Sequence, residues 1–326
     1  MEIPNGIIKF FEMCIKQMSR FILSNAAKIG VICLAVCMMF VACGNGKDKD
    51  DDDGTTGDNR FTVRNTEEWN SALRKIQNAG DNHTCTIIID GSFEINGYST
   101  PNPSFGSGKN IVVTFEGAGT VSLMNNSRGN LLRFRSEQTA IINGEDLIFK
   151  GRKGNESSLI RVEGGTLELK AGTLTGNSTS VNGAAVSNQG VVIMSGGAIT
   201  NNSNNHCGGA IFGGTFTMTG GVISGNSAQY GGAVCYSKFT MEGGVISGNT
   251  ASHRGGAVYI EVNDFFKKTG GTINGNDVTN PNIANGASPA GHAVFYFNRY
   301  IYYRNKTAGP NDNMDSGKED EAGGWE

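Results

Sequence analysis

The chain has 326 residues, of which 48 are glycine and 6 are proline, and its formal net charge is −3. The isoelectric point is near 5.9, so the basic excess that nucleic-acid binding requires is missing. Nucleic acid is therefore excluded as an expected partner.

Residues 1–42 are expected to be a secretory leader outside the fold. An apolar stretch runs from Ile29 to Ala42, which suits a leader and is too short for a membrane-spanning helix. An uncleaved N-terminal anchor is the alternative. The stretch before Lys28 is long for a leader, which leaves two candidate translation starts, Met1 and Met18. Basic residues precede the apolar stretch, at Lys9, Lys16, Arg20 and Lys28.

The leader ends in the sequence PheValAlaCys, with Phe40 at its start and Cys43 at its end. This ending resembles the lipobox of bacterial lipoproteins, although Phe40 replaces the usual leucine. The resemblance implies that Cys43 becomes the lipidated first residue and anchors the mature protein in a membrane. Gly44 at the next position is compatible with sorting to the outer membrane.

Residues 43–60 contain no hydrophobic residue after Cys43 and carry six aspartates, at Asp48, Asp50 to Asp53 and Asp58. Repulsion between like charges and the flexibility of glycine predict an extended acidic tether. Calcium binding is the alternative, but contiguous aspartates do not present the spaced oxygens of a calcium loop. Acidic runs after a lipidated cysteine also resemble surface-export signals of some bacteria.

Residues 61–305 are expected to form one folded unit. Thr66 begins the pattern of an N-capped amphipathic helix that extends to about Ala79, and this helix is the candidate cap of an open solenoid end. Residues 61–164 are predicted to be irregular coils. Their expected strands are Thr86 to Ile89 and the segments that begin at Ile111, Gly119, Asn130 and Asp146.

Residues 165–305 are a regular repeat. The phrases GGAITNN, GGVISGN, GGVISGN and GGTINGN begin at Gly196, Gly220, Gly243 and Gly270, which are 24, 23 and 27 residues apart. A period of this length is the signature of a solenoid.

Aligned repeats contain columns of one residue type. An aliphatic column predicted to face inward comprises Leu174, Ile199, Ile223, Ile246 and Ile273. A column of turn asparagines, for which left-handed backbone is expected, comprises Asn177, Asn202, Asn226, Asn249 and Asn276.

Two further segments alternate with period two, as strands do. The first segment has two inward columns, one that begins at Leu167 and one that begins at Leu169. The column from Leu169 breaks at Lys268, which indicates the end of the stack. The second segment, GGAV and its variants, has a steady column expected to face inward and a variable one expected to face outward. The steady column is Val186, Ile211, Val234, Val258 and Val294, and the variable column is Ser187, Phe212, Cys235, Tyr259 and Phe295.

Short strands separated by glycine- and asparagine-rich turns predict an all-β chain. The expected fold is a right-handed, single-stranded parallel β-helix with an N-terminal capping helix.

The segment from Phe295 to Asn305 is dense in aromatic residues. It is expected to be a last coil whose rings cover the open core. The alternative is a sugar-stacking platform in which Tyr300, Tyr302 and Tyr303 face the ligand. Residues 306–326 are expected to be a polar, poorly ordered tail.

Removal of the leader and lipidation of Cys43 would leave three cysteines, Cys85, Cys207 and Cys235. When adjacent coils are aligned, Cys207 and Cys235 are offset by about five strand residues, or about 15 Å, which is beyond disulfide reach. All three are predicted to be free thiols, shielded or nearly so from solvent.

The carboxylates and histidines do not form a recognisable catalytic or metal site. Glu168 and Glu242 are expected in equivalent columns three coils apart, about 14 Å, too far for a carboxylate pair. Glu261 and Asp264 are expected in an irregular loop. His206, His253 and His292 are also expected apart from one another, so no catalytic residue, metal site or cofactor is predicted.

The GGVISGN and GGAV units, the lipobox and the GGWE ending at Gly323 resemble the right-handed β-helix repeat lipoproteins of spirochaetes such as the oral treponemes. The resemblance is strong over residues 165–326 and weaker over 61–164. It implies a location in the envelope, and it supplies no catalytic residues.

The leading hypothesis is an exported lipoprotein, anchored to the outer membrane and exposed at the cell surface, which binds a host or matrix protein or a glycan. A polysaccharide lyase or glycoside hydrolase is the first alternative, and a structural envelope component the second. No enzyme activity is expected.

Overall fold

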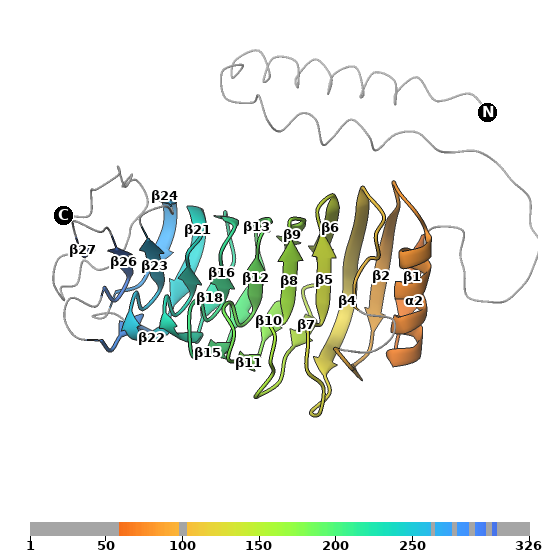
Figure 1. The fold of residues 1–326 in the computed structure, drawn as a ribbon, viewed down its shortest axis with the longest axis horizontal. Coiled ribbons are helices and arrows are strands. Elements are labelled where there is room, and N and C mark those ends of the chain that lie inside the picture. The colour runs from red at the N-terminus through yellow and green to blue at the C-terminus, as the bar shows by residue number, and fades with distance from the viewer. Residues whose placement is uncertain are drawn as a thin grey trace, which may run out of the picture. The chain divides into compact units, whose positions relative to one another are not determined.

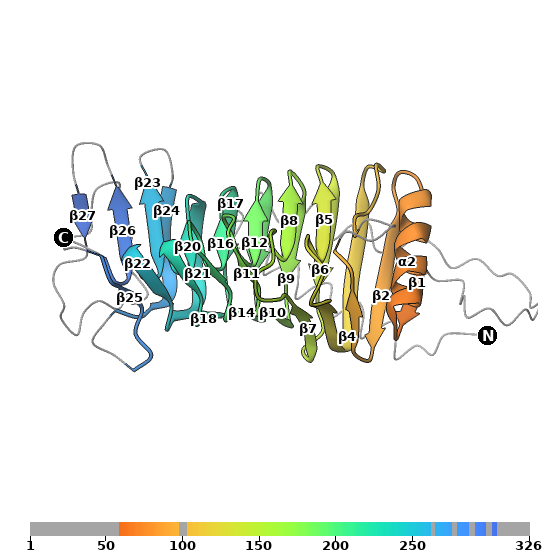
Figure 2. The ribbon, with the colours of Figure 1, turned by 60° about the horizontal axis from the view of Figure 1, so that its bottom comes forward.

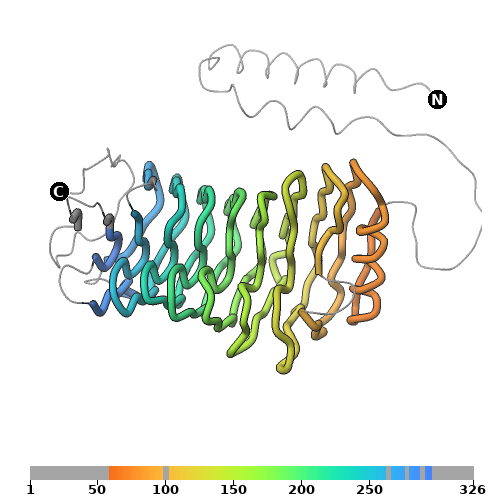
Figure 3. The backbone as a smooth tube through the Cα atoms, viewed as in Figure 1, coloured from red at the N-terminus to blue at the C-terminus, as the bar shows by residue number. Residues whose placement is uncertain are grey.

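A computed structural model describes residues 59–97, 103–261, 265–275, 279–286, 291–297 and 302–304. They form a parallel β-helix of about 8 turns with a single short helix near its start, which confirms the predicted fold class. Successive coils stack in chain order along the axis (Figures 1 and 3). Within these ranges, no helix is long and apolar enough to cross a bilayer.

Three sheets run along the stack, and all their strand pairs are parallel except the last one. Sheet A comprises β1 (Arg60–Val63), β2 (Thr84–Asp90), β3 (Phe93–Ile95), β4 (Ile111–Leu123), β6 (Gln138–Ile142), β7 (Leu147–Lys150), β9 (Thr166–Leu169), β10 (Thr173–Thr175), β13 (Val191–Met194), β14 (Ala198–Thr200), β17 (Thr215–Met218), β18 (Val222–Ser224), β21 (Lys238–Ser247) and β24 (Phe265–Ile273).

The other two sheets are narrower. Sheet B comprises β5 (Leu132–Arg135), β8 (Ile160–Glu163), β12 (Val186–Asn188), β16 (Ile211–Phe212), β20 (Val234–Cys235), β23 (Val258–Glu261), β26 (Val294–Phe297) and β27 (Tyr302–Arg304). Sheet C comprises β11 (Ser178–Thr179), β15 (Ser203–Asn204), β19 (Ser227–Tyr230), β22 (Thr250–Arg254) and β25 (Ile283–Ala284).

The helix α2 (Thr66–Asn78) lies at the β1 end of the stack (Figures 1 and 2). Its apolar face buries Trp69, whose ring centroid is 5.9 Å from that of Phe115. The helix begins one residue earlier than predicted, because Asn65 is the N-cap: its side chain accepts hydrogen bonds from the N–H groups of Glu67 and Glu68. The predicted cap, Thr66, instead donates its hydroxyl to the carbonyl of Glu94.

The early coils are more regular than the sequence indicated. The segments from Ile111 and Gly119 join into one strand, β4, because glycines with positive φ at 117 and 119 let the strand bend while it stays paired. Strands β1, β3, β6 and β8 (Ile160–Glu163) were not predicted.

The predicted inward columns are buried in one continuous core. Ile199, Ile223 and Ile246 are in register on neighbouring strands and are at most 1% exposed. The rings of Phe216 and Phe239 stack at 4.7 Å between centroids. Lys268 takes the place of methionine in the last coil and is also fully buried.

Each position of the GGVISGN phrase contributes to building a coil. A Cβ on Gly220 would clash with the carbonyl oxygen of Ser195 in the preceding coil, and Gly221 has a φ of 84° that disfavours any other residue. Val222 is 39% exposed, whereas Ile223 is buried. The phrase therefore specifies close stacking of coils and carries no ligand-binding group of its own.

The asparagines form a buried ladder along the turns between sheets A and C. In each step from Asn202 to Asn226 to Asn249, Oδ1 of the later residue accepts from both the backbone N–H and Nδ2 of the earlier one. The expectation of left-handed backbone at these asparagines was wrong, because the residue before each takes it: Gly176, Asn201, Gly225 and Gly248.

The ladder ends on Asn282, which accepts from the N–H and Nδ2 of Asn249. Asn276, the predicted member, lies outside the described residues. This last repeat contains extra residues, so its ladder asparagine, Asn282, comes later in the chain than the predicted Asn276.

Candidate functional site

One face of the solenoid carries side chains that building a coil does not require. On sheet B, inward residues alternate with outward ones that are in register from strand to strand. We call these outward residues the sheet B outer row, and they are Arg133, Arg161, Ser187, Phe212, Cys235, Tyr259 and Phe295. The row is basic at its first strands and aromatic at its last ones.

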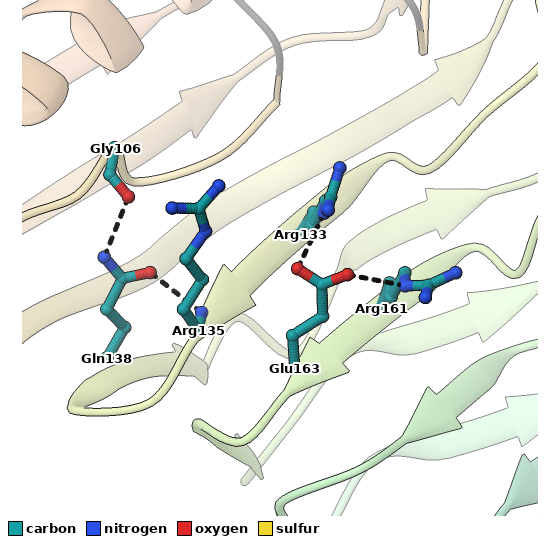
Figure 4. Close-up of polar contacts among 6 residues, drawn as sticks. All are labelled: Gly106, Arg133, Arg135, Gln138, Arg161 and Glu163. Atoms are coloured by element: carbon teal, nitrogen blue, oxygen red, sulfur yellow. Dashed lines mark hydrogen bonds and ion pairs between the residues drawn. The ribbon is translucent and has the colours of Figure 1, made fainter.

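The basic end is organised around Glu163. Its Oε2 accepts from Nε of Arg133 at 2.9 Å, and its Oε1 accepts from Nε of Arg161 at 2.8 Å (Figure 4). The Glu163 side chain is only 18% exposed, whereas those of Arg133 and Arg161 are 37% and 47% exposed. Two guanidinium groups therefore share one carboxylate and leave a net positive charge on this face.

Opposing influences set the pKa of Glu163. Burial acts to raise it, but the hydrogen bonds and charges of Arg133 and Arg161 outweigh burial and lower it below the ordinary value. Glu163 is therefore held as a carboxylate, which suits an ion pair and does not suit a general acid.

The neighbouring Arg135 is positioned by a buried glutamine. Oε1 of Gln138 accepts from the backbone N–H of Arg135 at 2.9 Å, and its Nε2 donates to the carbonyl of Gly106 (Figure 4). The same Nε2 also donates to the carbonyl of Gly108. Gln138 is only 2% exposed, so it ties the end of β5 to the loop of the preceding coil. Arg135 itself is exposed.

A recess of about 250 Å³ lies between the basic and aromatic ends of the row. Its lining includes Glu156, Arg161, Val181, Asn182, Ser187 and Phe212. It thus combines a ring and an aliphatic side chain with two groups of opposite charge, an amide and a hydroxyl. These groups can contact an apolar surface of a ligand and bond its polar groups at the same time.

The aromatic end differs from the sequence prediction. Tyr259 and Phe295 were expected to face outward but are 5% and 0% exposed, whereas Cys235, whose thiol was expected to be shielded, is 0% exposed. They form, with Cys207, a second apolar cluster against which Phe212, Tyr230 and Tyr236 pack. We call these seven residues the outer aromatic cluster. Rings from outside the column cover these residues: Tyr230 ends β19 and Tyr236 follows β20, so the column pattern did not reveal the burial.

Ring contacts run across several coils in this cluster. Tyr259 lies 5.1 Å from Tyr230, 5.5 Å from Tyr236 and 5.6 Å from Phe295, between centroids. Tyr236 adopts a φ of 51°, a left-handed conformation uncommon for a bulky residue, and its ring also contacts Phe212. The guanidinium of Arg254 lies 4.9 Å from the Phe295 centroid.

Glu261 accepts hydrogen bonds from Tyr236 at 2.7 Å and Tyr259 at 3.4 Å. Burial first, and the nearby Glu261 second, raise the pKa of both phenols, so they stay protonated and donate. The expectation of a loop here was wrong for Glu261, which ends β23. Asp264 lies outside the described residues.

Cys207 and Cys235 are thiols, as predicted, and so is Cys85. The predicted separation of about 15 Å was wrong, because the Cys207 and Cys235 side chains are hydrogen-bonded to one another. The prediction assumed an extended chain. Instead Gly208, with a φ of 71°, folds the chain back so that a Cβ there would lie 3.2 Å from Cβ of Phe212.

The remaining carboxylates and histidines do not converge. Glu168 and Glu242 are not in equivalent columns as predicted, since the register places Thr240 in the Glu168 column. His253 contacts the ring of Tyr230 at 5.3 Å, and Nδ1 of His292 accepts from the N–H of Ala284. In the described ranges, no group of three or more acidic, histidine or cysteine residues could hold a metal.

The predicted site residues lie mostly beyond what the structure describes. Cys43 and Tyr300 are outside the described residues, as are the side chains of Tyr302 and Tyr303. The backbone of these last two lies in β27, which pairs antiparallel with β26 at the end of sheet B.

Sequence reasoning missed Arg133, Arg161 and Glu163. Their strands lack the glycine phrase, but extending the inward column back to Leu132 and Ile160 would have placed both arginines outward. Comparisons with models of protein families, with curated proteins and with solved structures give no significant match to this chain.

Proposed function

We propose that this chain is a binding or adhesion module whose ligand-facing surface is the sheet B outer row. One observation carries the proposal: the row places arginines, a polar recess and an aromatic ring in succession on adjacent coils. The buried core and the turns account for the stacking of the coils, and they do so without the arginines, the recess or the ring of the outer row. Rigid strands hold these groups at fixed spacing, which favours recognition of an extended ligand.

The expected ligand is a host or matrix glycan or protein. Phe212 offers a ring face to the apolar face of a sugar, while Arg161 and Asn182 offer donors to hydroxyl or carboxylate groups. The basic end of the row favours a ligand that carries negative charge.

We further propose that the protein is a lipoprotein anchored through Cys43 in the outer membrane and displayed at the cell surface. The support comes from the sequence: the leader pattern, the cysteine at its end, the acidic tether and the resemblance to spirochaete repeat lipoproteins. A tether of this composition would hold the solenoid away from the membrane.

The experiment combines protease shaving of intact cells with a glycan and matrix-protein binding screen. Arg161→Ala and Phe212→Ala should each weaken binding at least about tenfold. Thr217→Ala and Val222→Ala, on the outward side of sheet A, serve as matched controls and should bind normally.

Three results would contradict the proposal. Protection of the protein in intact cells would contradict surface display. Equal binding by all four variants would contradict the outer row as the ligand-facing surface. Cleavage of a bound glycan would favour the alternative, a polysaccharide lyase or glycoside hydrolase.

A further inference from the structure

Two thiols from adjacent coils meet in the outer aromatic cluster. Cys235 lies on β20 opposite Phe212 of β16, and Cys207 precedes the turn that leads into β16. The backbone of Cys207 is bridged to Tyr230 of the next coil, so both cysteines lie where the same two coils touch. Both side chains belong to one apolar cluster and are hydrogen-bonded to one another, which places the two sulfur atoms close together.

The two thiols differ in access. Cys207 is 8% exposed at the edge of the cluster, whereas Cys235 is fully buried beneath it. The hydrogen bond with Cys235, the largest influence, lowers the pKa of the Cys207 thiol, although burial and the charge of Glu261 oppose it. A thiol with a lowered pKa has a larger thiolate fraction and reacts faster with disulfides.

Cys85 provides an internal contrast. It is 2% exposed in the main core, and burial raises its pKa to about 12. It is therefore expected to be inert in the folded protein.

We infer that Cys207 and Cys235 form a redox pair that closes to a disulfide between adjacent coils, with Cys207 as the attacking thiol and Cys235 as the resolving one. A low-molecular-weight disulfide is the oxidant. This inference does not depend on the proposed binding function.

The exchange balances in two steps. The Cys207 thiolate attacks one sulfur of the external disulfide, which forms a mixed disulfide and releases one small thiolate. Cys235 then loses its proton and attacks the Cys207 sulfur of the mixed disulfide, which releases the second small thiolate. Two protein thiols are oxidised, and one external disulfide is reduced to two small thiols.

The test treats the folded, reduced full-length protein with oxidised glutathione, alkylates the remaining thiols and cleaves the chain after methionine. Cleavage at Met194, Met218 and Met241 separates Cys207 in fragment 195–218 from Cys235 in fragment 219–241. The expected product is these two fragments joined by a bond that dithiothreitol breaks. Cys207 should react at least about tenfold faster than Cys85.

Variants separate the two roles. Cys235→Ser should accumulate a stable mixed disulfide between Cys207 and glutathione, and Cys207→Ser should leave Cys235 alkylatable after unfolding. Cys85→Ser should behave as the parent protein. The inference is overturned if the folded parent protein keeps both thiols, or if the linked fragments form only in urea.

Discussion

Oδ1 of Asn226 accepts two hydrogen bonds from Asn202, one from its backbone N–H and one from its Nδ2, each at 3.0 Å. Asn226 in turn donates its own Nδ2 to the carbonyls of Ile199 and Ser224 and to Oδ1 of Asn249. Asn226 is 1% exposed, so water does not replace these bonds. The side chain therefore joins three successive coils at one turn.

Replacing Asn226 with alanine should lower the free energy of unfolding by about 3 kcal/mol, because the buried N–H of Asn202 loses its acceptor and the carbonyls of Ile199 and Ser224 lose a donor. Asn226→Asp should also be destabilising, since a carboxylate cannot donate to the two carbonyls. Urea denaturation followed by circular dichroism measures both effects. Asn205→Ala is the control, because Asn205 is exposed one turn away. Equal stability of the Asn205 and Asn226 variants would contradict a structural role for the ladder.

The first glycine of each repeated phrase should be intolerant of any side chain. We expect Gly220→Ala to cost about 2–3 kcal/mol, because its Cβ would meet the carbonyl oxygen of Ser195 and force the coils apart. Val222 lies two residues later and is 39% exposed. Val222→Ala should therefore change the free energy of unfolding by less than about 0.5 kcal/mol. Comparable losses in the two variants would show that stacking at Gly220 is not the constraint.

The repeated coils could be predicted from sequence because each coil pairs with a copy of itself. Ile223 lies beside Ile199 and Ile246, so one column of similar residues reports a row of contacts. The same reasoning fails for contacts between a strand and a turn. Tyr230 ends β19 of sheet C and Tyr236 lies in the turn after β20, so no column of sheet B predicted that they pack against the cluster that contains Tyr259.

The site was less predictable than the fold for two physical reasons. The contact between Cys207 and Cys235 depends on a reversal of the chain at Gly208, which linear spacing cannot show. The pairing of Glu163 with two arginines depends on the register of β5 and β8. These strands have no repeated phrase that would reveal that register.

The N-cap of α2 gives a direct test of the difference between Asn65 and Thr66. Asn65→Ala should reduce the free energy of unfolding by about 1 kcal/mol, because the N–H groups of Glu67 and Glu68 lose their acceptor. Asn65→Asp keeps a side-chain acceptor and should retain nearly all of the stability. Thermal unfolding monitored at the helix band measures the change. An Asn65→Asp variant as unstable as Asn65→Ala would argue that the side-chain acceptor does not matter.

Acidification should release the ion-pair network at Glu163. Arg133 and Arg161 lower the pKa of Glu163 against the effect of burial. The Glu163 carboxylate therefore binds a proton less readily in the folded protein than in the unfolded chain, where its pKa is near 4.5. The stabilisation by Glu163 is therefore fully present above that pH and is lost as the pH falls through the lower, folded value. Glu163→Gln should be less stable than the parent by about 1 kcal/mol at pH 7, and the difference should shrink on acidification. Urea midpoints of both proteins between neutral and acidic pH measure this difference in stability.

Glu137→Gln is the control: this carboxylate is 52% exposed and 3.8 Å from Nζ of Lys109, so its removal should have little effect. A difference for Glu163→Gln that stays constant or widens as the pH falls would contradict the assignment of Glu163 as a carboxylate held by the two arginines.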